Sequence, residues 1–286
     1  MIDFILKITF VFLWASAFVA AKLGLDDAGP FSMLTVRFAI VSCIFASLVF
    51  IFRAKWPKWG EIPYIALVGI LLHGLYLGGV FFSIKQGTSA GISSLIVSLH
   101  PVLTCILAIF IIEEKITLDR WIGIFMGFIG VILVVWPRMG GEFPLIGFLS
   151  CFVALVAISF ATIIQKKYLE NMDILGGNSV QAIFAALFFL MLVLLIEPFH
   201  FNLTTDLLIS MTWLILLVSL GAISILMILI KRGEMSSTAS LFFLAPPVSA
   251  ILGYVVFGEK LGALGILGFI IACTGVWIVN RKYSKK

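Results

Sequence analysis

Two histidines in this sequence have the chemistry and the spacing to form a site together. His73 and His100 stand in neighbouring apolar runs, on either side of a turn centred near Gln86 and Gly87. If both runs are helices, they are antiparallel and bring the two imidazoles to a similar depth. An imidazole exchanges a proton near physiological pH, so either histidine could bind a ligand or carry a proton. The alternative is a neutral histidine that is hydrogen-bonded between helices.

Three further charged residues lie inside apolar runs or end them. Arg37 lies inside a run. Its role there is either to bind a carboxylate or form an ion pair, or to extend its long side chain to the nearest surface. Glu114 and Glu259 each end a run and are followed by a lysine. We favour solvated helix ends for these glutamates and keep a pair of gate residues, one at each surface, as the alternative.

Three prolines interrupt two of the apolar runs. Pro101 and the pair Pro246-Pro247 stand at corresponding places in the two halves of the chain. A proline inside a helix has no N–H and leaves the carbonyl four residues earlier without its usual partner. In an apolar environment that carbonyl must find another donor. We therefore predict hinges or cavity walls at these prolines, with a kink that only shapes the packing as the alternative.

Other polar and aromatic residues near the middle of the runs are candidates for lining a cavity. They are Trp14, Ser16, Tyr76, Gln165, Asn178 and Gln181. Aromatic side chains in apolar runs also pack against lipid, and amides also form hydrogen bonds between helices, so these are the alternatives.

The sequence argues against catalysis. It contains no HExxH, Walker or GxSxG motif. Gly91-Ile92-Ser93-Ser94 matches the GxSx of intramembrane serine proteases, but no histidine follows in a later apolar run. The four cysteines lie inside apolar runs and form no CxxC. We predict no enzyme, no metal site, no disulfide and no cofactor, and without a nucleotide-binding loop any energy source is a gradient.

The elements that position these residues are membrane helices. Hydrophobic residues make up 62% of the 286 residues and charged residues 12%, with a mean hydropathy of +1.22. About 20 apolar residues cross the hydrocarbon core as a helix. Short connections separate ten such runs, and we predict an all-α membrane protein with ten transmembrane helices. The runs are about 4–24, 31–52, 61–84, 88–112, 120–136, 144–168, 175–197, 207–231, 235–257 and 262–280.

The net charge is +5, and the basic residues are spread over the connections between the runs. We therefore interpret them as signals of membrane topology and not as a nucleic-acid-binding surface. If the N-terminus is inside, most lysines and arginines lie in inner connections. The positive-inside rule therefore predicts that both termini are cytoplasmic.

The chain contains an internal repeat. Gly91–Val134 and Ser236–Val279 match at a constant offset of 145 residues, which aligns Pro101 with Pro246 and Glu114 with Glu259. The offset contains five runs, an odd number, so matched runs cross the membrane in opposite directions. We predict two five-helix repeats, residues 1–141 and 142–286, in inverted topology. Such repeats place a substrate site near the midplane between them.

The sequence resembles the drug/metabolite transporter superfamily, and within it the EamA-type ten-helix carriers. The resemblance covers nearly the whole chain and rests on several short motifs. They are the Pro101 and Pro246 runs, the Glu114-Lys115 and Gly258-Glu259-Lys260 turns, Gly123 with Gly130, Gly268 with Gly275, Pro30 with Arg37-Phe38, and Trp14-Ala15-Ser16-Ala17-Phe18. The last departs from the Trp-Gly-Ser-Asn-Phe that the family often has. The resemblance implies a central cavity and export or exchange of small metabolites such as amino acids.

We therefore expect a carrier for small organic metabolites that works by alternating access, with proton coupling as one option and facilitated exchange as another. The expected partners are a small-molecule substrate, the lipid bilayer and protons, and not nucleic acid. We expect a monomer or homodimer in the cell inner membrane. The alternative is a multi-pass protein that does not transport, such as a lipid-modifying enzyme or a subunit of a complex.

Overall fold

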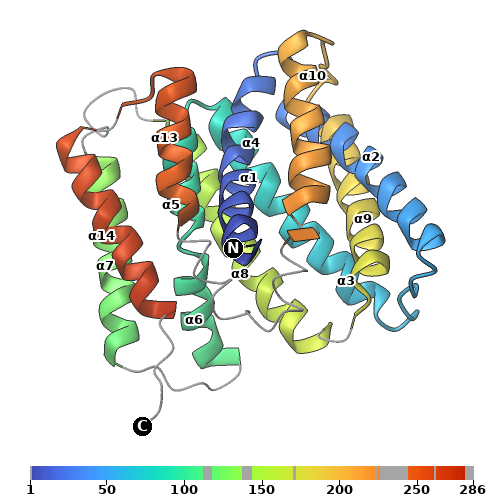
Figure 1. Cartoon of the computed structure of the whole chain (residues 1–286), viewed down its shortest axis with the longest axis horizontal. Coiled ribbons are helices and arrows are strands. Elements are labelled where there is room, and N and C mark those ends of the chain that lie inside the picture. Colours follow the sequence, from blue (N-terminus) through green and yellow to red (C-terminus); the bar gives the residue numbers. More distant parts are fainter. Residues whose placement is uncertain are drawn as a thin grey trace.

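The computed structural model is a bundle of α-helices (Figure 1). It describes residues 2–111, 118–136, 144–169, 172–222, 224–225, 244–260 and 262–280. Within these ranges there is no strand, and one isolated β-bridge joins Ala28 to Phe201 in two loops. Glu114 and residues 226–243, which include parts of two expected spans, lie outside the described residues.

Among the described residues, the first half of the chain supplies five helical segments. They are α1 (Ile2–Gly24); α2 (Pro30–Ile51); α3 (Ile62–Gly69) with the π-helix η1 (Ile70–Leu75) and α4 (Tyr76–Lys85); α5 (Ala90–Val97) with α6 (His100–Ile111); and α7 (Leu118–Val135). The second half follows the same order. Its segments are α8 (Leu145–Tyr168); α9 (Ile174–Leu195); α10 (Thr205–Thr212) with the π-helix η3 (Trp213–Ala222); α13 (Ala245–Phe257); and α14 (Ala263–Asn280).

The helices have the length and composition of membrane spans. Among the described residues, six segments are long and apolar enough to cross a bilayer, and four shorter apolar helices accompany them. The chain is therefore an all-α, multi-pass membrane protein, as the sequence predicts. The number of ten spans and the inverted arrangement stay predictions.

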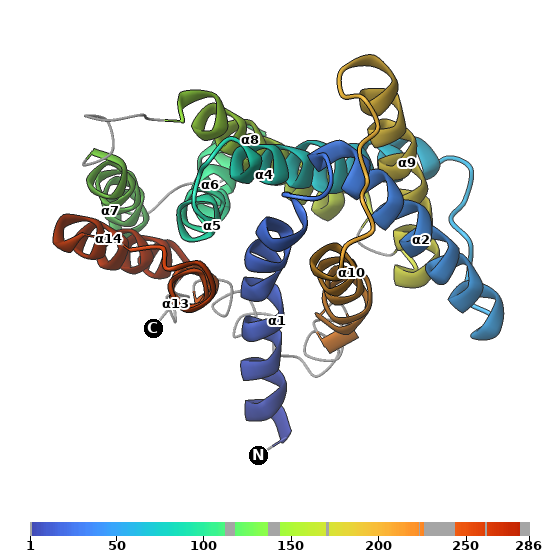
Figure 2. The same cartoon turned by 90° about the horizontal axis from the view of Figure 1, so that it is seen from above.

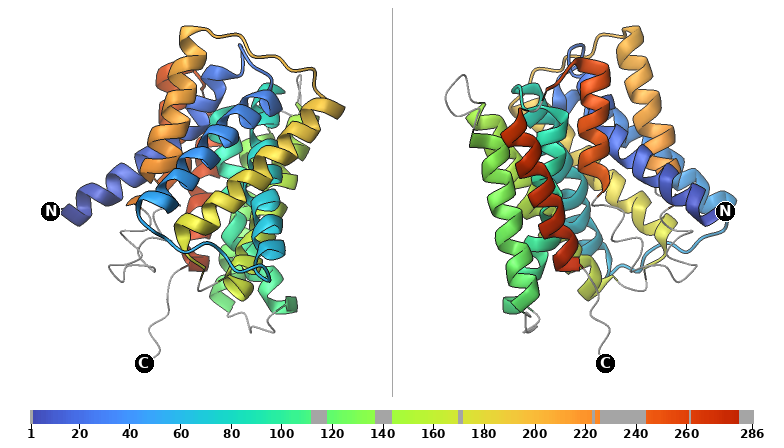
Figure 3. Two further views of the ribbon diagram at one scale, coloured as in Figure 1. Left: turned by 90° about the vertical axis from the view of Figure 1, so that its right-hand side faces the viewer. Right: turned by 60° about the vertical axis from the view of Figure 1, so that its left-hand side comes forward.

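The helices α7 and α14 meet through glycines that are matched by the repeat. The two helices lie side by side (Figure 1), as they also do in Figure 3. A Cβ atom on Gly130 would lie 2.5 Å from the carbonyl oxygen of Gly268, and one on Gly275 would lie 2.6 Å from that of Gly123. Because Gly130 corresponds to Gly275 and Gly123 to Gly268, each contact is the counterpart of the other. The helices are antiparallel, and their contact is reciprocal, as across a two-fold axis.

The third segment of each half contains a π-helix at corresponding positions. η1 includes His73 and η3 includes Val218, and the 145-residue offset aligns these two positions. π-helical turns are rare in proteins and frequent at functional sites. The repeat is thus visible in a backbone feature that the sequence does not reveal.

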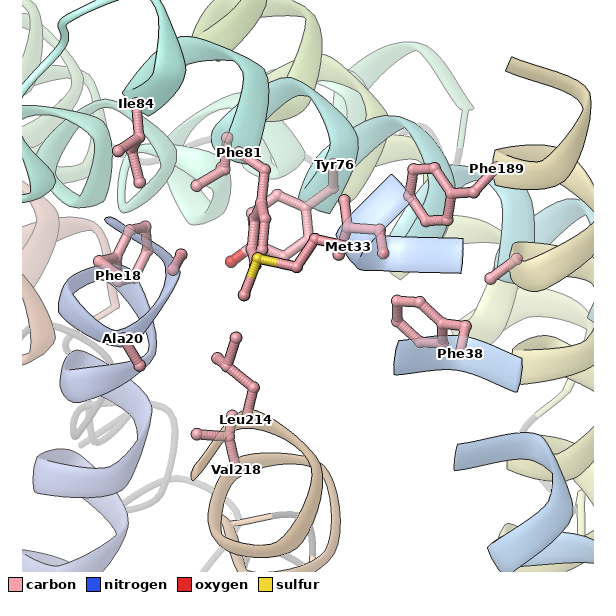
Figure 4. Packing of buried hydrophobic residues seen from close by; sticks show 14 of the residues in the cluster. Phe18, Ala20, Met33, Phe38, Tyr76, Phe81, Ile84, Phe189, Leu214 and Val218 are labelled. Atoms are coloured by element: carbon pink, nitrogen blue, oxygen red, sulfur yellow. The ribbon is translucent and has the colours of Figure 1, made fainter. Parts of the chain in front are cut away.

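The largest buried cluster lies between the halves. Phe38 of α2 packs against Phe189 of α9, with ring centroids 6.0 Å apart, and Tyr76 and Val218 belong to the same cluster. Figure 4 shows these side chains directed toward one region from α2, α4, α9 and η3. Seen from above, α1, α2, α4 and α10 surround this region (Figure 2).

Candidate functional site

A cavity of about 280 Å³ lies between the two halves. Its residues come from α1, α2, η1 and α4 of the first half and from α8, α9 and η3 of the second. They are Trp14, Ala17, Phe18, Arg37, Phe38, Val41, Phe45, Leu72, His73, Tyr76, Leu77, Val80, Phe81, Gln165, Ile174, Asn178, Gln181, Ala182, Val218 and Ser219. The wall is mostly apolar, with a few polar groups, as is usual for small-molecule sites.

Arg37 is the charged residue of this cavity among the residues described. Its side chain is 4% exposed, and its Nη2 atom donates a hydrogen bond to Ser219 Oγ at 3.0 Å. The guanidinium carbon lies 5.5 Å from the ring centroid of Phe38. The hydrogen bond joins α2 of the first half to η3 of the second. Arg37 therefore lies between the halves with its side chain buried in this conformation, and its role stays a prediction.

His73 and Gln181 form a second polar group in the cavity. The imidazole of His73 lies 5.1 Å from the Phe38 ring, centroid to centroid, and forms a side-chain hydrogen bond with Gln181. Gln181 is 1% exposed, and its Nε2 atom has no hydrogen-bond partner among the described residues. A buried amide N–H without a partner is costly, so the cavity contains a donor that a ligand could satisfy.

The other expected cavity residues divide into two groups. Trp14, Tyr76, Gln165 and Asn178 line the cavity. Ser16 does not: its hydroxyl donates to the Leu13 carbonyl oxygen at 2.9 Å and accepts from Trp213 Nε1 at 2.8 Å. The bond to Leu13 lies within α1, and the bond from Trp213 joins α1 to η3, so Ser16 has a packing role in this conformation.

His100 lies away from this cavity. Its Nδ1 atom is 3.2 Å from the Val97 carbonyl oxygen, and its own carbonyl oxygen accepts a hydrogen bond from Ser159 at 3.3 Å. The two histidines that the sequence places at a similar depth therefore have different surroundings, and a role for His100 in the substrate path stays a prediction.

The prolines lie at helix starts in the described residues. Pro101 is in the first turn of α6, directly after the break at Ser98 and Leu99 that separates α5 from α6. Pro246 and Pro247 are in the first turn of α13. Neither Pro246 nor Pro247 lines the cavity. Their role as hinges stays a prediction.

The two ends of the cavity differ. At one end the wall reaches Ile174, the first residue of α9. Gly176, in the same turn of α9, lies against the backbone of Lys55, in the basic loop that we predict to be cytoplasmic. At the other end of α9, the Glu197 carboxylate accepts hydrogen bonds from the backbone N–H groups of Phe31 and Ser32, at 3.3 and 2.8 Å. A carboxylate at a helix N-terminus is stabilised by the helix dipole. Here it joins the second half to α2 of the first.

A second carboxylate joins the halves at this same end. Glu259 Oε1 lies 2.5 Å from Lys22 Nζ and accepts from the Ala90 backbone N–H at 3.4 Å. The Lys22 ammonium also lies 4.6 Å from the ring centroid of Phe257. The positions matched to Lys22 and Glu259 in the other half are Lys167 and Glu114, so the repeat supplies the same two residue types again.

Several cavity residues give no signal in the sequence. Phe45 and Phe81 are two of 27 phenylalanines, and Ser219 resembles every other serine of the apolar runs. Only the positions of α2, α4 and η3 in space distinguish them. The residues that sequence reasoning could select were those that are rare in apolar runs, such as Arg37 and His73.

Comparison with known proteins identifies a family and relatives that are similar to this chain over nearly its whole length. The model of the "EamA-like transporter family" matches residues 2–136 and again residues 145–281. The chain is 28% identical to an "Uncharacterized transporter" of Archaeoglobus fulgidus over 97% of this chain and 98% of that protein. It is 25% identical to a "Probable amino-acid metabolite efflux pump" of Salmonella typhimurium, covering 96% of this chain and 94% of that protein.

A solved structure supports the fold. A protein of known crystal structure superposes with a TM-score of 0.65 at 17% sequence identity, over 96% of this chain and 95% of that one. At this identity the similarity concerns the fold alone.

Proposed function

The chain belongs to the EamA-like transporter family, and from this membership we propose that it exports or exchanges small organic metabolites, most of all amino acids or related compounds. The observation that carries the proposal is the cavity between the two halves, which is closed at one end by contacts between them. The name of the Salmonella typhimurium relative supports the substrate class. In this proposal the chain is a carrier and not an enzyme.

We propose alternating access between two inverted five-helix repeats. The reciprocal glycine contact of α7 and α14 and the matched π-helices support the inverted arrangement, because both follow the 145-residue offset. In such a protein the halves exchange shapes, which moves the opening from one membrane face to the other. The described conformation would then be the one that faces the cytoplasm of the cell.

We propose the ion pair of Lys22 and Glu259 as the outer gate. It joins α1 to the end of α13, and its side chains are 33% and 13% exposed. Exchange of the halves would replace this pair by the matched residues Lys167 and Glu114 at the inner face. The inner part of this proposal rests on the sequence repeat, since Glu114 lies outside the described residues.

We propose His73 as the candidate site for proton coupling. It lines the cavity beside Gln181, whereas the matched position in the second half is Val218. A proton step at His73 would therefore occur once per cycle on one side of the pseudo-two-fold axis. His100 is the second candidate, from the sequence alone.

The test is counterflow in proteoliposomes with a panel of amino acids, nucleosides and organic cations at pH 6 and pH 8. Saturable uptake of one class by the purified protein is the expected result. Liposomes without protein give the background. Absence of uptake by folded protein for every class would contradict the carrier function and favour a protein that does not transport.

A further inference from the structure

Arg37 gives the cavity a fixed positive charge, and no counter-ion faces it among the described residues. No aspartate or glutamate is among the cavity residues in the part of the chain that is described. A buried charge that lacks a partner is strongly destabilising. The cavity therefore has an electrostatic preference of its own, independent of any relative: it favours an anionic group and disfavours a cationic one.

The hydrogen bonds of Arg37 leave donors available. A guanidinium has five N–H donors in a planar fork that matches the two oxygens of a carboxylate. Nη2 donates to Ser219 Oγ, while Nε is buried and has no partner among the described residues. Nε2 of Gln181 is likewise buried without a partner and lines the same cavity. Two neighbouring elements, α2 and α9, thus contribute unsatisfied donors to one space.

The rest of the cavity indicates what accompanies the anionic group. Its wall is rich in aromatic side chains, among them Trp14, Phe38, Tyr76 and Phe81. The volume of about 280 Å³ is close to the lower limit of small-molecule sites, about 300 Å³. A compact molecule with an apolar body and one carboxylate satisfies the charge, the open donors and the size together.

We propose that Arg37 binds the carboxylate of the substrate, with Gln181 as a second donor, so that the cavity selects carboxylates with an apolar body and excludes organic cations. The proposal rests on the proposed transport function, and it deepens that function from small metabolites to a charge class. It assigns Arg37 as the residue that determines charge specificity.

The experiment measures binding, so that it is separate from transport. Purified protein is titrated with 3-phenylpropionate and 3-phenylpropionamide, which share an apolar body, and with L-phenylalanine and 2-phenylethylamine. Binding is followed by tryptophan fluorescence, since Trp14 lines the cavity. We expect each carboxylate to bind roughly 10- to 100-fold more tightly than its partner without the carboxylate, as for loss of a charged hydrogen bond.

A matched pair of variants tests Arg37 without removing it. Ser219→Asp places a carboxylate beside the guanidinium, where Ser219 Oγ is 3.0 Å from Nη2. It should satisfy Arg37 from within the protein and abolish the preference for 3-phenylpropionate. Ser219→Asn has nearly the same size without the charge and should keep the preference. Arg37→Gln should reduce the affinity for 3-phenylpropionate to that for the amide.

The outcomes separate this proposal from the transport function. Equal binding of acid and amide, no binding of either at millimolar concentration, or an unchanged preference in Ser219→Asp would overturn the role of Arg37. Transport of nucleosides or cations would also overturn it, while the carrier function would stand. Selective binding of carboxylates without counterflow would support the site and contradict transport.

Discussion

The contact between α7 and α14 and the cavity between the halves use the internal repeat in opposite ways. In the helix contact, matched positions hold the same residue, and Gly130 and Gly275 each meet a matched glycine of the other half. In the cavity, matched positions differ: Arg37 corresponds to Ala182 and His73 to Val218, and all four line it.

The difference has a physical cause. A contact across a two-fold axis needs identical residues on both sides, because each side performs the same packing. A substrate with one carboxylate is asymmetric, so a single buried arginine suffices, and a second at the matched position would be another uncompensated charge. The backbone of the site follows the repeat, while its chemistry departs from it.

The largest expected effect concerns the glycines. Gly130→Leu and Gly275→Leu insert four carbon atoms where a Cβ atom would already lie 2.4 or 2.6 Å from neighbouring backbone. Each should destabilise the fold by about 3 kcal/mol or more, measured as loss of monodisperse protein and a lower Tm. Gly262→Leu, where a Cβ atom meets no neighbouring atom within 4 Å, is the control. Clearly unequal effects of the first two would contradict a reciprocal contact.

The cavity should show the opposite behaviour, since its two sides are not equivalent. His73→Gln keeps a polar side chain beside Gln181 but cannot take up a proton near neutral pH. We expect counterflow to be at least roughly tenfold slower and to lose its difference between pH 6 and pH 8, since a general acid–base group typically contributes about 10²- to 10⁴-fold. His100→Gln should have a smaller effect, because His100 lies outside the cavity. Persistent pH dependence in His73→Gln would remove the proton role.

The gate residues should give effects of opposite sign. Glu259→Gln weakens a partly exposed ion pair. The conformational equilibrium should therefore shift toward the outward-facing form by about 1 kcal/mol, or roughly fivefold. Glu114→Gln should shift it the other way. The readout is labelling of Ala17→Cys in the cavity by an impermeant thiol reagent, with the four native cysteines replaced. Lys260→Gln, at an exposed neighbour, is the control. Shifts of the same sign would contradict the symmetric gate.

The smallest effect distinguishes two ways of capping corresponding helices. Asp173 Oδ1 accepts hydrogen bonds from the backbone N–H groups of Leu175 and Gly176 at the start of α9, while α2 is capped by Glu197 from the other half. Asp173→Ala should cost about 1 kcal/mol in stability. It should leave the labelling of Ala17→Cys unchanged, whereas Glu197→Gln should increase it. Increased labelling in both variants would show that the caps do not differ in role.

The sequence was sufficient for the membrane class, because hydropathy depends only on composition along the chain. It also selected Arg37, His73 and Gln181, since such residues are costly in apolar helices and stand out there. It could not separate His73 from His100, because both occupy similar places in sequence, and only the position of η1 at the cavity distinguishes them. The sequence also could not predict that Lys22 pairs with Glu259, since the two residues are 237 positions apart in the chain.

The reciprocal glycines of α7 and α14 have a consequence for the energetics of the proposed cycle. When the halves exchange shapes, the contact of Gly130 with Gly268 becomes that of Gly275 with Gly123, which is the same contact. Its free energy is then equal in both states and cancels from the ratio of their populations. This interface can be as strong as packing allows without holding the carrier in either state. The difference in free energy between the two states is then determined by the ion pairs and the cavity, where the two halves are not alike.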